Sequence, residues 1–222
     1  MAFNPTLEQQ AIVETAVTTK DNLLITALAG AAKTSTLVLV AEALPNVEIL
    51  TLAFNKRIQL EMQERLPSNC TAKTLNGLGH SAWGKFLSQR LHLNDSKTYE
   101  IVEALIKSLP DPEDKRVAYD LMAEILRAVG SGKTAGYLPD SFCKKYRQWT
   151  PRPLMSDEEF LGWLDEEYPT HVQDLIVEAS AISAEKAMKG EIDFSDQVLM
   201  PVVMPASFER FALVLVDEAQ DL

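Results

Sequence analysis

The sequence predicts an α/β fold in which a parallel β-sheet is interrupted by an all-helical insertion. In residues 1–86, short apolar runs alternate with helical patterns, as expected for a parallel sheet covered on both faces. Residues 87–190 show apolar residues three and four apart, typical of helices, and no convincing strand. An apolar run returns at 211–217, so we expect residues 191–222 to complete the first sheet.

The expected elements of this sheet domain follow from local signals. Thr6 and Gln9 have the spacing of a helix capping box, and Pro45 ends a helical pattern because proline cannot donate a backbone hydrogen bond. Apolar runs bounded by polar or small residues predict buried strands. In chain order, we expect a helix at 7–17, a strand at 22–28, a helix at 34–44, a strand at 47–54, a helix at 55–66, and strands at 71–74 and 211–217.

Composition excludes several classes of protein. With 222 residues, 46% hydrophobic and 24% charged, the chain has the make-up of a globular protein of one large or two small domains. No apolar run approaches the ~20 residues that span a bilayer, and the first residues lack a secretory signal pattern. Two cysteines, Cys70 and Cys143, give no disulfide framework and indicate a reducing compartment.

Charge is distributed unevenly along the chain. The net charge is −11, yet residues 51–90 contain six basic and two acidic residues, a local charge of +4. Solvated helix faces would explain this segment, and so would a local surface for nucleic acid.

Two segments resemble phosphate-binding loops. Residues 27–34 keep Lys33 and Thr34 but have Ala27 and Ala32 where G-x-x-x-x-G-K-[ST] has glycines. Residues 130–134, Gly-Ser-Gly-Lys-Thr, look closer to the pattern but follow a helix and precede no helix. A phosphate loop needs a strand before it and a helix after it, which favours 27–34. We therefore expect 130–134 to be a helix end and loop, with Gly130 or Gly132 as the C-cap.

Ala32 weakens the favoured loop. If its position requires a positive φ, alanine costs ~1–2 kcal/mol relative to glycine. A plain strand–turn–helix with an exposed lysine remains the alternative.

Two adjacent carboxylates, Asp217 and Glu218, follow the last expected strand. Ligands of doubly wound sheets bind at the carboxyl ends of the strands, so these side chains are expected near Lys33 and Thr34. Lys33 would bind the β- and γ-phosphates of ATP, while Thr34 and, through water, Asp217 would hold Mg²⁺. Glu218 would orient and deprotonate the attacking water. The alternative is a strand that ends in solvated acids.

At residues 217–221, Asp-Glu-Ala-Gln-Asp, the chain resembles motif II of superfamily 1 DNA helicases of the UvrD/Rep type, and it is similar to their phage-encoded and F-box-helicase-like branch. The resemblance covers residues 4–86 and 191–222. It implies a P-loop NTPase (RecA-like) fold with an incomplete sheet, in which 1–86 and 191–222 form motor domain 1A and 87–190 form an inserted helical subdomain, 1B. It also implies ATP and Mg²⁺ as cofactors and a cytoplasmic protein of a bacterial or phage-infected cell.

The resemblance assigns nucleotide-binding residues to two motifs. Residues 5–9 are similar to the Q motif, in which Gln9, rather than Gln10, would read adenine; its capping role is compatible with this. Residues 27–34 are similar to motif I. The implied nucleotide-binding set is Gln9, Ala29, Gly30, Ala31, Ala32, Lys33, Thr34 and Ser35, and the implied catalytic set is Lys33, Glu218 and Gln220.

The resemblance also assigns a surface for single-stranded DNA. Residues 52–56 and 74–78 are similar to motifs Ia and Ib, and residues 192–196 to a family segment that precedes motif II. Phe54 would stack on a base or, alternatively, lie in the core. The polar contacts to the DNA backbone would come from Asn55, Lys56, Thr74 and Asn76, of which Asn76 stands where histidine is frequent.

These expectations lead to one main hypothesis and two alternatives. The chain would be the N-terminal part of an ATP-dependent 3′-to-5′ DNA helicase that translocates on single-stranded DNA and unwinds duplex at a junction. Motifs III–VI and a second motor domain are expected after Leu222, so the chain alone would hydrolyse ATP poorly. The alternatives are a catalytically inactive nucleotide- or single-stranded-DNA-binding module and another P-loop ATPase. Trp83, Trp149 and Trp163 are expected to make packing contacts rather than to stack on bases.

Overall fold

The computed structural model describes residues 4–28, 30–164 and 168–221, and the chain forms two compact units. Unit 1 consists of Met1–Leu75 and Glu209–Leu222, and unit 2 of Asn76–Phe208. These boundaries differ from the expected ones at 86/87 and 190/191. The reason is a shared core: Trp83 and Met200, from the segments on either side of the expected insertion, are both fully buried in one hydrophobic cluster of unit 2.

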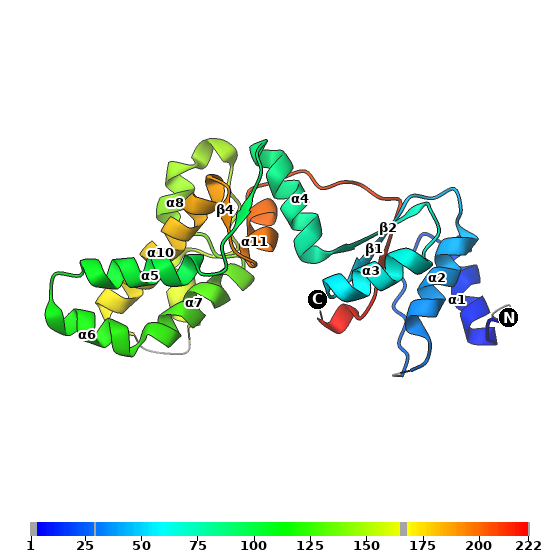
Figure 1. The fold of residues 1–222 in the computed structure, drawn as a ribbon, viewed down its shortest axis with the longest axis horizontal. Coiled ribbons are helices and arrows are strands. Elements are labelled where there is room, and N and C mark those ends of the chain that lie inside the picture. The colour runs from blue at the N-terminus through cyan, green and yellow to red at the C-terminus, as the bar shows by residue number, and fades with distance from the viewer. Residues whose placement is uncertain (1–3, 29, 165–167, 222) are drawn as a thin grey trace. The chain divides into compact units, whose positions relative to one another are not determined.

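Unit 1 is an α/β unit with a parallel sheet (Figure 1). Its elements are α1 (Leu7–Thr18), α2 (Lys33–Ala43), β1 (Ile49–Ala53), α3 (Lys56–Arg65), β2 (Cys70–Thr74), β5 (Leu213–Val216) and the 3-10 helix η2 (Ala219–Asp221). The strand order is β2-β1-β5, and both pairings are parallel. This confirms the expected α/β class and the strands expected at 47–54, 71–74 and 211–217.

The strand expected at 22–28 is wrong. These residues are irregular, and Leu24 and Leu28 are 89% and 84% exposed. The edge strands β2 and β5 each leave one edge open, yet residues 22–28 pair with neither in the described part of the chain. An apolar run alone does not make a strand, because a strand also needs a partner that takes up its backbone hydrogen bonds.

The core of unit 1 lies between the sheet and its helices. Ile49 and Ala53 of β1 are fully buried against Val40 of α2 and Met62 of α3. Two glutamines of α3 also bond to β2, which is an edge strand of the sheet. Gln59 donates to the carbonyl of Ala72, and the backbone N–H of Ala72 donates to Gln63. Side chains thus satisfy backbone groups that an edge strand would otherwise expose.

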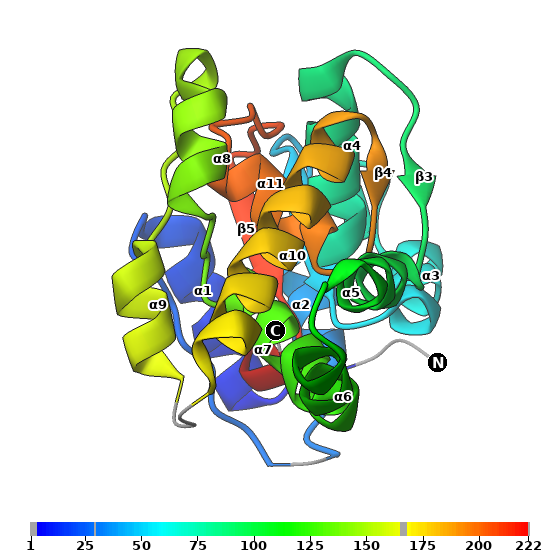
Figure 2. The same ribbon diagram turned by 90° about the vertical axis from the view of Figure 1, so that its left-hand side faces the viewer.

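Unit 2 is mostly helical, as expected for the insertion (Figure 2). Its helices are α4 (Leu75–Leu87), which begins at the unit boundary, α5 (Lys97–Ser108), α6 (Pro112–Asp120), α7 (Met122–Thr134), α8 (Asp140–Lys145), η1 (Arg147–Trp149), α9 (Asp157–Trp163), α10 (Thr170–Met188) and α11 (Asp196–Val203). It also contains a small parallel sheet that the sequence analysis missed, formed by β3 (His92–Leu93) and β4 (Glu191–Ile192). None of the helices in the described ranges is long and apolar enough to cross a bilayer.

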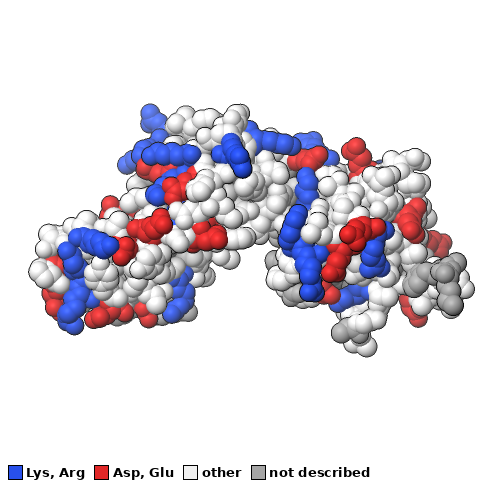
Figure 3. All heavy atoms as spheres, in the orientation of Figure 1, with Lys and Arg blue, Asp and Glu red and all other residues white. Residues whose placement is uncertain are grey.

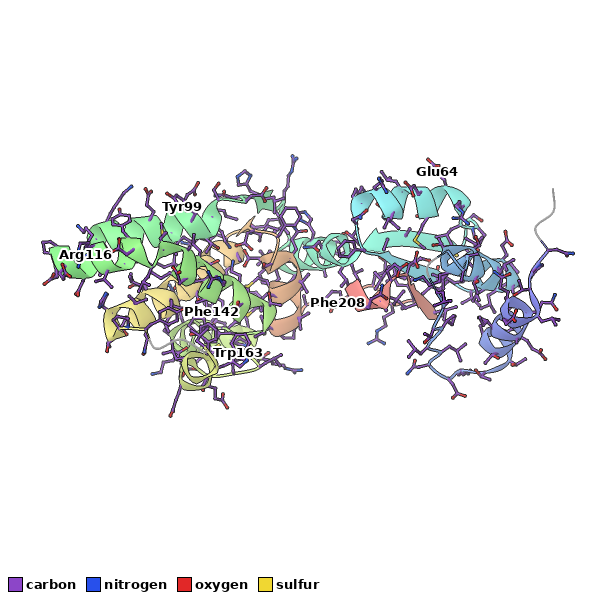
Figure 4. The ribbon with its side chains drawn as sticks, turned by 90° about the horizontal axis from the view of Figure 1, so that it is seen from below. Glu64, Tyr99, Arg116, Phe142, Trp163 and Phe208 are labelled. Atoms are coloured by element: carbon purple, nitrogen blue, oxygen red, sulfur yellow. The ribbon has the colours of Figure 1, made fainter. Side chains whose placement is uncertain are left out.

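Helix α10 connects two hydrophobic cores of unit 2. Its first part contributes Val172 and Ile176 to a first core with α5, α7 and α9. Its last part contributes Ala184 and Ala187 to a second core. In this second core Trp83 is fully buried, and its indole N–H donates to the carbonyl of Ala187. Figure 4 shows Phe142, another member of the second core, among the helices of unit 2.

The segment 130–134 is not the helix end and loop that the sequence suggested. Helix α7 continues to Thr134, Ala135 is its C-cap, and the left-handed glycine is Gly136, with φ of 79°. Gly132 is required by packing, since a Cβ atom there would lie 2.9 Å from the ring of Phe160. Two helical glycines were therefore mistaken for loop residues.

Lys133, which made this segment look like a phosphate loop, belongs to a buried ion cluster. The cluster consists of Lys97, Lys133, Asp193 and Asp196, all with side chains at most 13% exposed. Burial alone raises the pKa of Asp193, but the ammonium groups of Lys133 and Lys97 outweigh it and lower the pKa to about 2. The cluster holds the 193–196 turn against α5 and α7.

Replacing Lys133 tests the structural role of this cluster. Lys133→Met keeps an unbranched side chain but leaves buried carboxylates short of a partner, so we expect the free energy of unfolding to fall by about 3–5 kcal/mol. Lys144→Met, at an exposed position of α8, is the matched control, and its free energy of unfolding should stay within about 0.5 kcal/mol of the parent's. Urea denaturation measures both. Equal stability of the two variants would contradict the role of the cluster.

Candidate functional site

The loop before α2 has the backbone of an anion-binding turn. The N–H of Ala31 donates to the carbonyl of Leu28 at 3.1 Å, and Gly30 and Ala32 have left-handed φ values of 80° and 57°. Ala32 is the N-cap of α2 and provides no side-chain hydrogen bond, so the first N–H groups of the helix have no capping side chain. Such N–H groups at a helix N-terminus suit a phosphate. Ala29, assigned to the same loop, lies outside the described residues.

Two contacts join this loop to the end of β5. The hydroxyl of Thr34 donates to Asp217 Oδ2 at 2.9 Å, and Lys33 Nζ lies 2.9 Å from Glu218 Oε2. The parallel register explains the meeting, because Asp217 follows β5 and its N–H donates to the carbonyl of Leu52 in β1. The sheet therefore brings together four of the residues that the sequence assigned to one site.

The local electrostatics keep Glu218 ionised. The hydrogen bond from the Gln220 carboxamide, at 2.6 Å to Oε2, and that from Lys33 hold the pKa of Glu218 below its usual range. Glu218 also has a left-handed φ of 51°, which is uncommon for a residue with a Cβ atom. Strained backbone of this kind tends to be retained at functional sites.

The donor set fits a magnesium nucleotide. A hydroxyl and a carboxylate, from Thr34 and Asp217, are the hard oxygen ligands that Mg²⁺ prefers. Lys33 and the uncapped start of α2 offer positive charge and N–H donors to phosphate. Asp217 is 5% exposed, and its Oδ2 accepts a hydrogen bond from the Thr34 hydroxyl. A bound Mg²⁺ would take the place of this hydrogen bond between its two ligands.

Gln9 lies close to this loop, and both ends of its carboxamide are hydrogen-bonded. It is 6% exposed, and its Oε1 accepts from the Thr6 N–H in the predicted capping box, which is confirmed. Its Nε2 donates to Thr36 Oγ1 at 3.0 Å, and Thr36 in turn bonds to the carbonyl of Ala32. Gln9 therefore ties α1 to α2, while its role in reading adenine stays a prediction.

Two supporting residues of the loop were missed by the sequence analysis. Thr36 is the partner of Gln9, and Arg65 of α3 donates to the hydroxyl of Ser35 at 2.9 Å. Neither lies in a motif, and Arg65 is about thirty positions from its partner. Only Thr36 could have been found from the sequence, because it lies one helical turn after Ala32 and so on the same face of the helix.

The residues assigned to DNA occupy the same carboxyl edge of the sheet in unit 1, with one exception. Phe54 and Asn55 follow β1, and Thr74 ends β2 opposite Ala53. Phe54 is 51% exposed, so the core alternative for it is wrong. Asn55 caps α3 by accepting from the Ile58 N–H, and Lys56 bonds to Gln59. The exception is Asn76, which belongs to unit 2 and donates to the carbonyl of Phe194.

The left-handed backbone at Ala32 yields a test by substitution. Ala32→Gly should raise the free energy of unfolding by up to about 1 kcal/mol, because the strain of a left-handed alanine exceeds the entropy cost of glycine. Gly30→Ala is the opposite substitution and serves as the control. The added Cβ atom would meet no atom within 4 Å, but alanine is strained at a φ of 80°, so the free energy of unfolding should fall by about 1–2 kcal/mol. Calorimetric melting measures both. Loss of stability in Ala32→Gly would show that the loop does not have this backbone.

Two DNA helicases are similar to part of this chain. F-box DNA helicase 1 of Gallus gallus is 36% identical over 92 residues, which are 41% of this chain and 9% of that protein. F-box DNA helicase protein 1 of Schizosaccharomyces pombe (strain 972 / ATCC 24843) is 37% identical over 84 residues, 38% of this chain and 9% of that protein. The matched part thus spans under a tenth of either relative.

A family match covers far more of the chain. Residues 9–222 match the family described as AAA domain, and so include the phosphate loop, the helical unit and the carboxylates after β5. The fold and the site geometry agree with a P-loop of the helicase-like kind. Because the match extends over nearly the whole length, this chain belongs to the AAA domain family.

Proposed function

We propose that this chain is the nucleotide-binding motor part of an ATP-dependent DNA helicase. The observation that carries the proposal is the pair of contacts between the start of α2 and the end of β5, Thr34 with Asp217 and Lys33 with Glu218. They place a hydroxyl, an ammonium group and two carboxylates at one edge of a parallel sheet, beside an uncapped helix N-terminus. That combination suits phosphate and a divalent cation.

Each residue has a distinct role in this proposal. Lys33, with the N–H groups of the 30–35 turn, would bind the β- and γ-phosphate oxygens of ATP, and Thr34 and Asp217 would hold Mg²⁺. When bound, Mg²⁺ supplies positive charge that offsets the charge of the phosphates. Lys33 would have to leave Glu218 to reach a phosphate. Glu218 would then be an ionised carboxylate free to accept a proton at Oε2 from an attacking water, with Gln220 still orienting it.

The proposed DNA contact lies on the same unit. Phe54 exposes half of its surface at the carboxyl edge of the sheet, and Asn55, Lys56 and Thr74 lie beside it. An exposed aromatic ring with neighbouring polar side chains suits stacking of a base and contacts to a single-stranded backbone. Both relatives are named DNA helicases, which favours DNA as the partner. A single-stranded/duplex junction, 3′-to-5′ polarity, stepping driven by hydrolysis and a second motor domain are further parts of the proposal.

A second candidate is a nucleotide-binding module without turnover. The strained Ala32 favours it, because its methyl group stands where the phosphate-loop pattern has glycine. Both candidates bind ATP and differ in hydrolysis. Stimulation of ATP hydrolysis by single-stranded DNA, measured on the whole protein, would separate them.

Nucleotide binding is tested at Lys33. Lys33→Ala removes the ammonium group from the loop, and we expect the Kd for Mg²⁺–ATP to rise about 10- to 100-fold, the usual effect of losing a charged hydrogen bond. Lys20→Ala, which removes an exposed lysine of the same unit, is the control and should leave the Kd unchanged. Titration of a fluorescent ATP analogue measures both. Unchanged affinity in Lys33→Ala would overturn the loop assignment.

DNA binding is tested at Phe54. Phe54→Ala removes the proposed stacking face, so single-stranded DNA should bind about 5- to 100-fold more weakly. Leu60→Ala is the matched control, because Leu60 is 52% exposed on α3 of the same unit. Fluorescence anisotropy of a labelled oligonucleotide gives the affinities. Equal affinities of the two variants would contradict the stacking role.

A further inference from the structure

The second core of unit 2 is surrounded by basic side chains that have no acidic partner. Leaving Arg127 aside, seven lysines and arginines of the described part of unit 2 make no ion pair. Lys115 of α6 is one of them. The other six are Lys85, Arg90, Lys144, Arg147, Arg152 and Lys189.

These six residues are neighbours of the second core. Five of them are adjacent in sequence to one of its members, as Lys144 is to Cys143 and Arg147 is to Tyr146. The sixth, Arg152, donates its backbone N–H to the carbonyl of Val203, a buried residue of the same core. All six side chains are exposed. We call them the basic rim.

Three of the six belong to one short segment. Residues 141–156 contain four basic residues and no acidic one, in a chain whose net charge is −11. Of these four, Lys145 is neutralised by Glu185 at 2.6 Å. Lys144, Arg147 and Arg152 remain without an acidic partner. In Figure 3, Lys and Arg side chains gather along the edge of unit 2 over α8 and the C-terminal end of α4, whereas elsewhere on that face of the unit they are mixed with Asp and Glu.

An aromatic ring lies within the same surface. Trp149 is 43% exposed, and its ring centroid is 5.2 Å from that of Phe86 at an angle of 57°. Phe86 in turn stacks on the fully buried Trp83 at 4.9 Å. Trp149 is therefore anchored to the core through Phe86 and still presents part of its surface to solvent. All three tryptophans make the expected packing contacts, Trp163 with Phe160, but of the three only Trp83 is fully buried.

Basic side chains next to a fixed, half-exposed tryptophan are the features that bind single-stranded nucleic acid. The charges contact successive phosphates, and the ring accepts a base, which a duplex keeps paired inside. We propose that the basic rim and Trp149 form a second binding surface for single-stranded DNA, on unit 2 and separate from the Phe54 edge of unit 1. The choice of DNA rests on the proposed function, whereas the charge and the ring are properties of this surface itself.

The salt dependence of binding by the full chain tests the charges. In Lys144→Ala/Arg147→Ala/Arg152→Ala, we expect affinity for a labelled oligothymidylate to fall at least about tenfold at low salt, and the slope of log K against log salt to become shallower by about 2, at about 0.7 per lost phosphate contact. The measurement is made without nucleotide. An unchanged slope would overturn the proposal.

A matched variant excludes a general effect of net charge. Lys107→Ala/Lys115→Ala/Arg116→Ala removes the same charge from α5 and α6, where Lys107 pairs with Glu103 and Arg116 with Glu113. Figure 4 shows Arg116 at one end of unit 2. This variant should keep the parent's slope. A loss of slope equal to that of the rim variant would mean that total charge, and not this surface, attracts the DNA.

Trp149→Leu tests whether the surface prefers single-stranded DNA to duplex DNA. It should weaken oligothymidylate binding about 5-fold or more and leave duplex binding unchanged, while far-UV circular dichroism confirms that the variant is folded. Duplex that competes as well as the single strand, with no effect of Trp149→Leu, would overturn the single-strand assignment. Combining the rim variant with Phe54→Ala distinguishes this proposal from the proposed function. If the losses of DNA affinity add up in the combined variant, the chain has two DNA-binding surfaces. If only Phe54→Ala lowers the affinity, the Phe54 edge of unit 1 binds DNA and the basic rim does not.

Discussion

The parallel register of β1 and β5 is the constraint on which the candidate site depends. Thr34 and Asp217 are 183 positions apart, and their 2.9 Å contact exists because β5 pairs with β1 and ends at the same edge of the sheet. Between β2 and β5 the chain passes through the whole of unit 2 and then returns to the sheet. A shift of one residue in this pairing would turn Asp217 to the opposite face of the sheet and away from α2.

Local strain accompanies the site. Ala32 and Glu218 have left-handed backbone, and they lie at the two ends of the pairs that join α2 to β5. Other contacts in unit 1 have to supply the free energy that offsets this backbone strain. The buried residues Ile49, Ala53 and Met62 fix the sheet against its helices, and the Gln9–Thr36 bond fixes α1 against the start of α2. A rigid scaffold therefore holds a loop that would not adopt its conformation alone.

Unit 2 uses the same residue types for other purposes. Lys133 stands in a string that imitates a phosphate loop, but it is buried with Lys97 between two aspartates. Its neighbour Gly132 leaves room for an aromatic ring. At the second core the basic residues face solvent without acidic partners, and there they are available to an anionic ligand. Burial and neighbours, rather than residue type, separate a structural lysine from one that can bind a ligand.

The sequence alone determined the α/β class, the capping box at Thr6, three of the four expected strands, and the pairing of Lys33 and Thr34 with Asp217 and Glu218. These follow from short-range patterns and from the rule that parallel strands end at one edge. Only the tertiary structure decided that residues 22–28 lack a strand partner, that Gly132 belongs inside a helix, and that α4 and α11 pack with the helical unit. Each of these depends on residues far apart in the chain: whether a distant strand pairs with 22–28, the ring of Phe160 beside Gly132, and the core around Trp83. Local sequence carries no record of such contacts, because burial and pairing are properties of the folded chain.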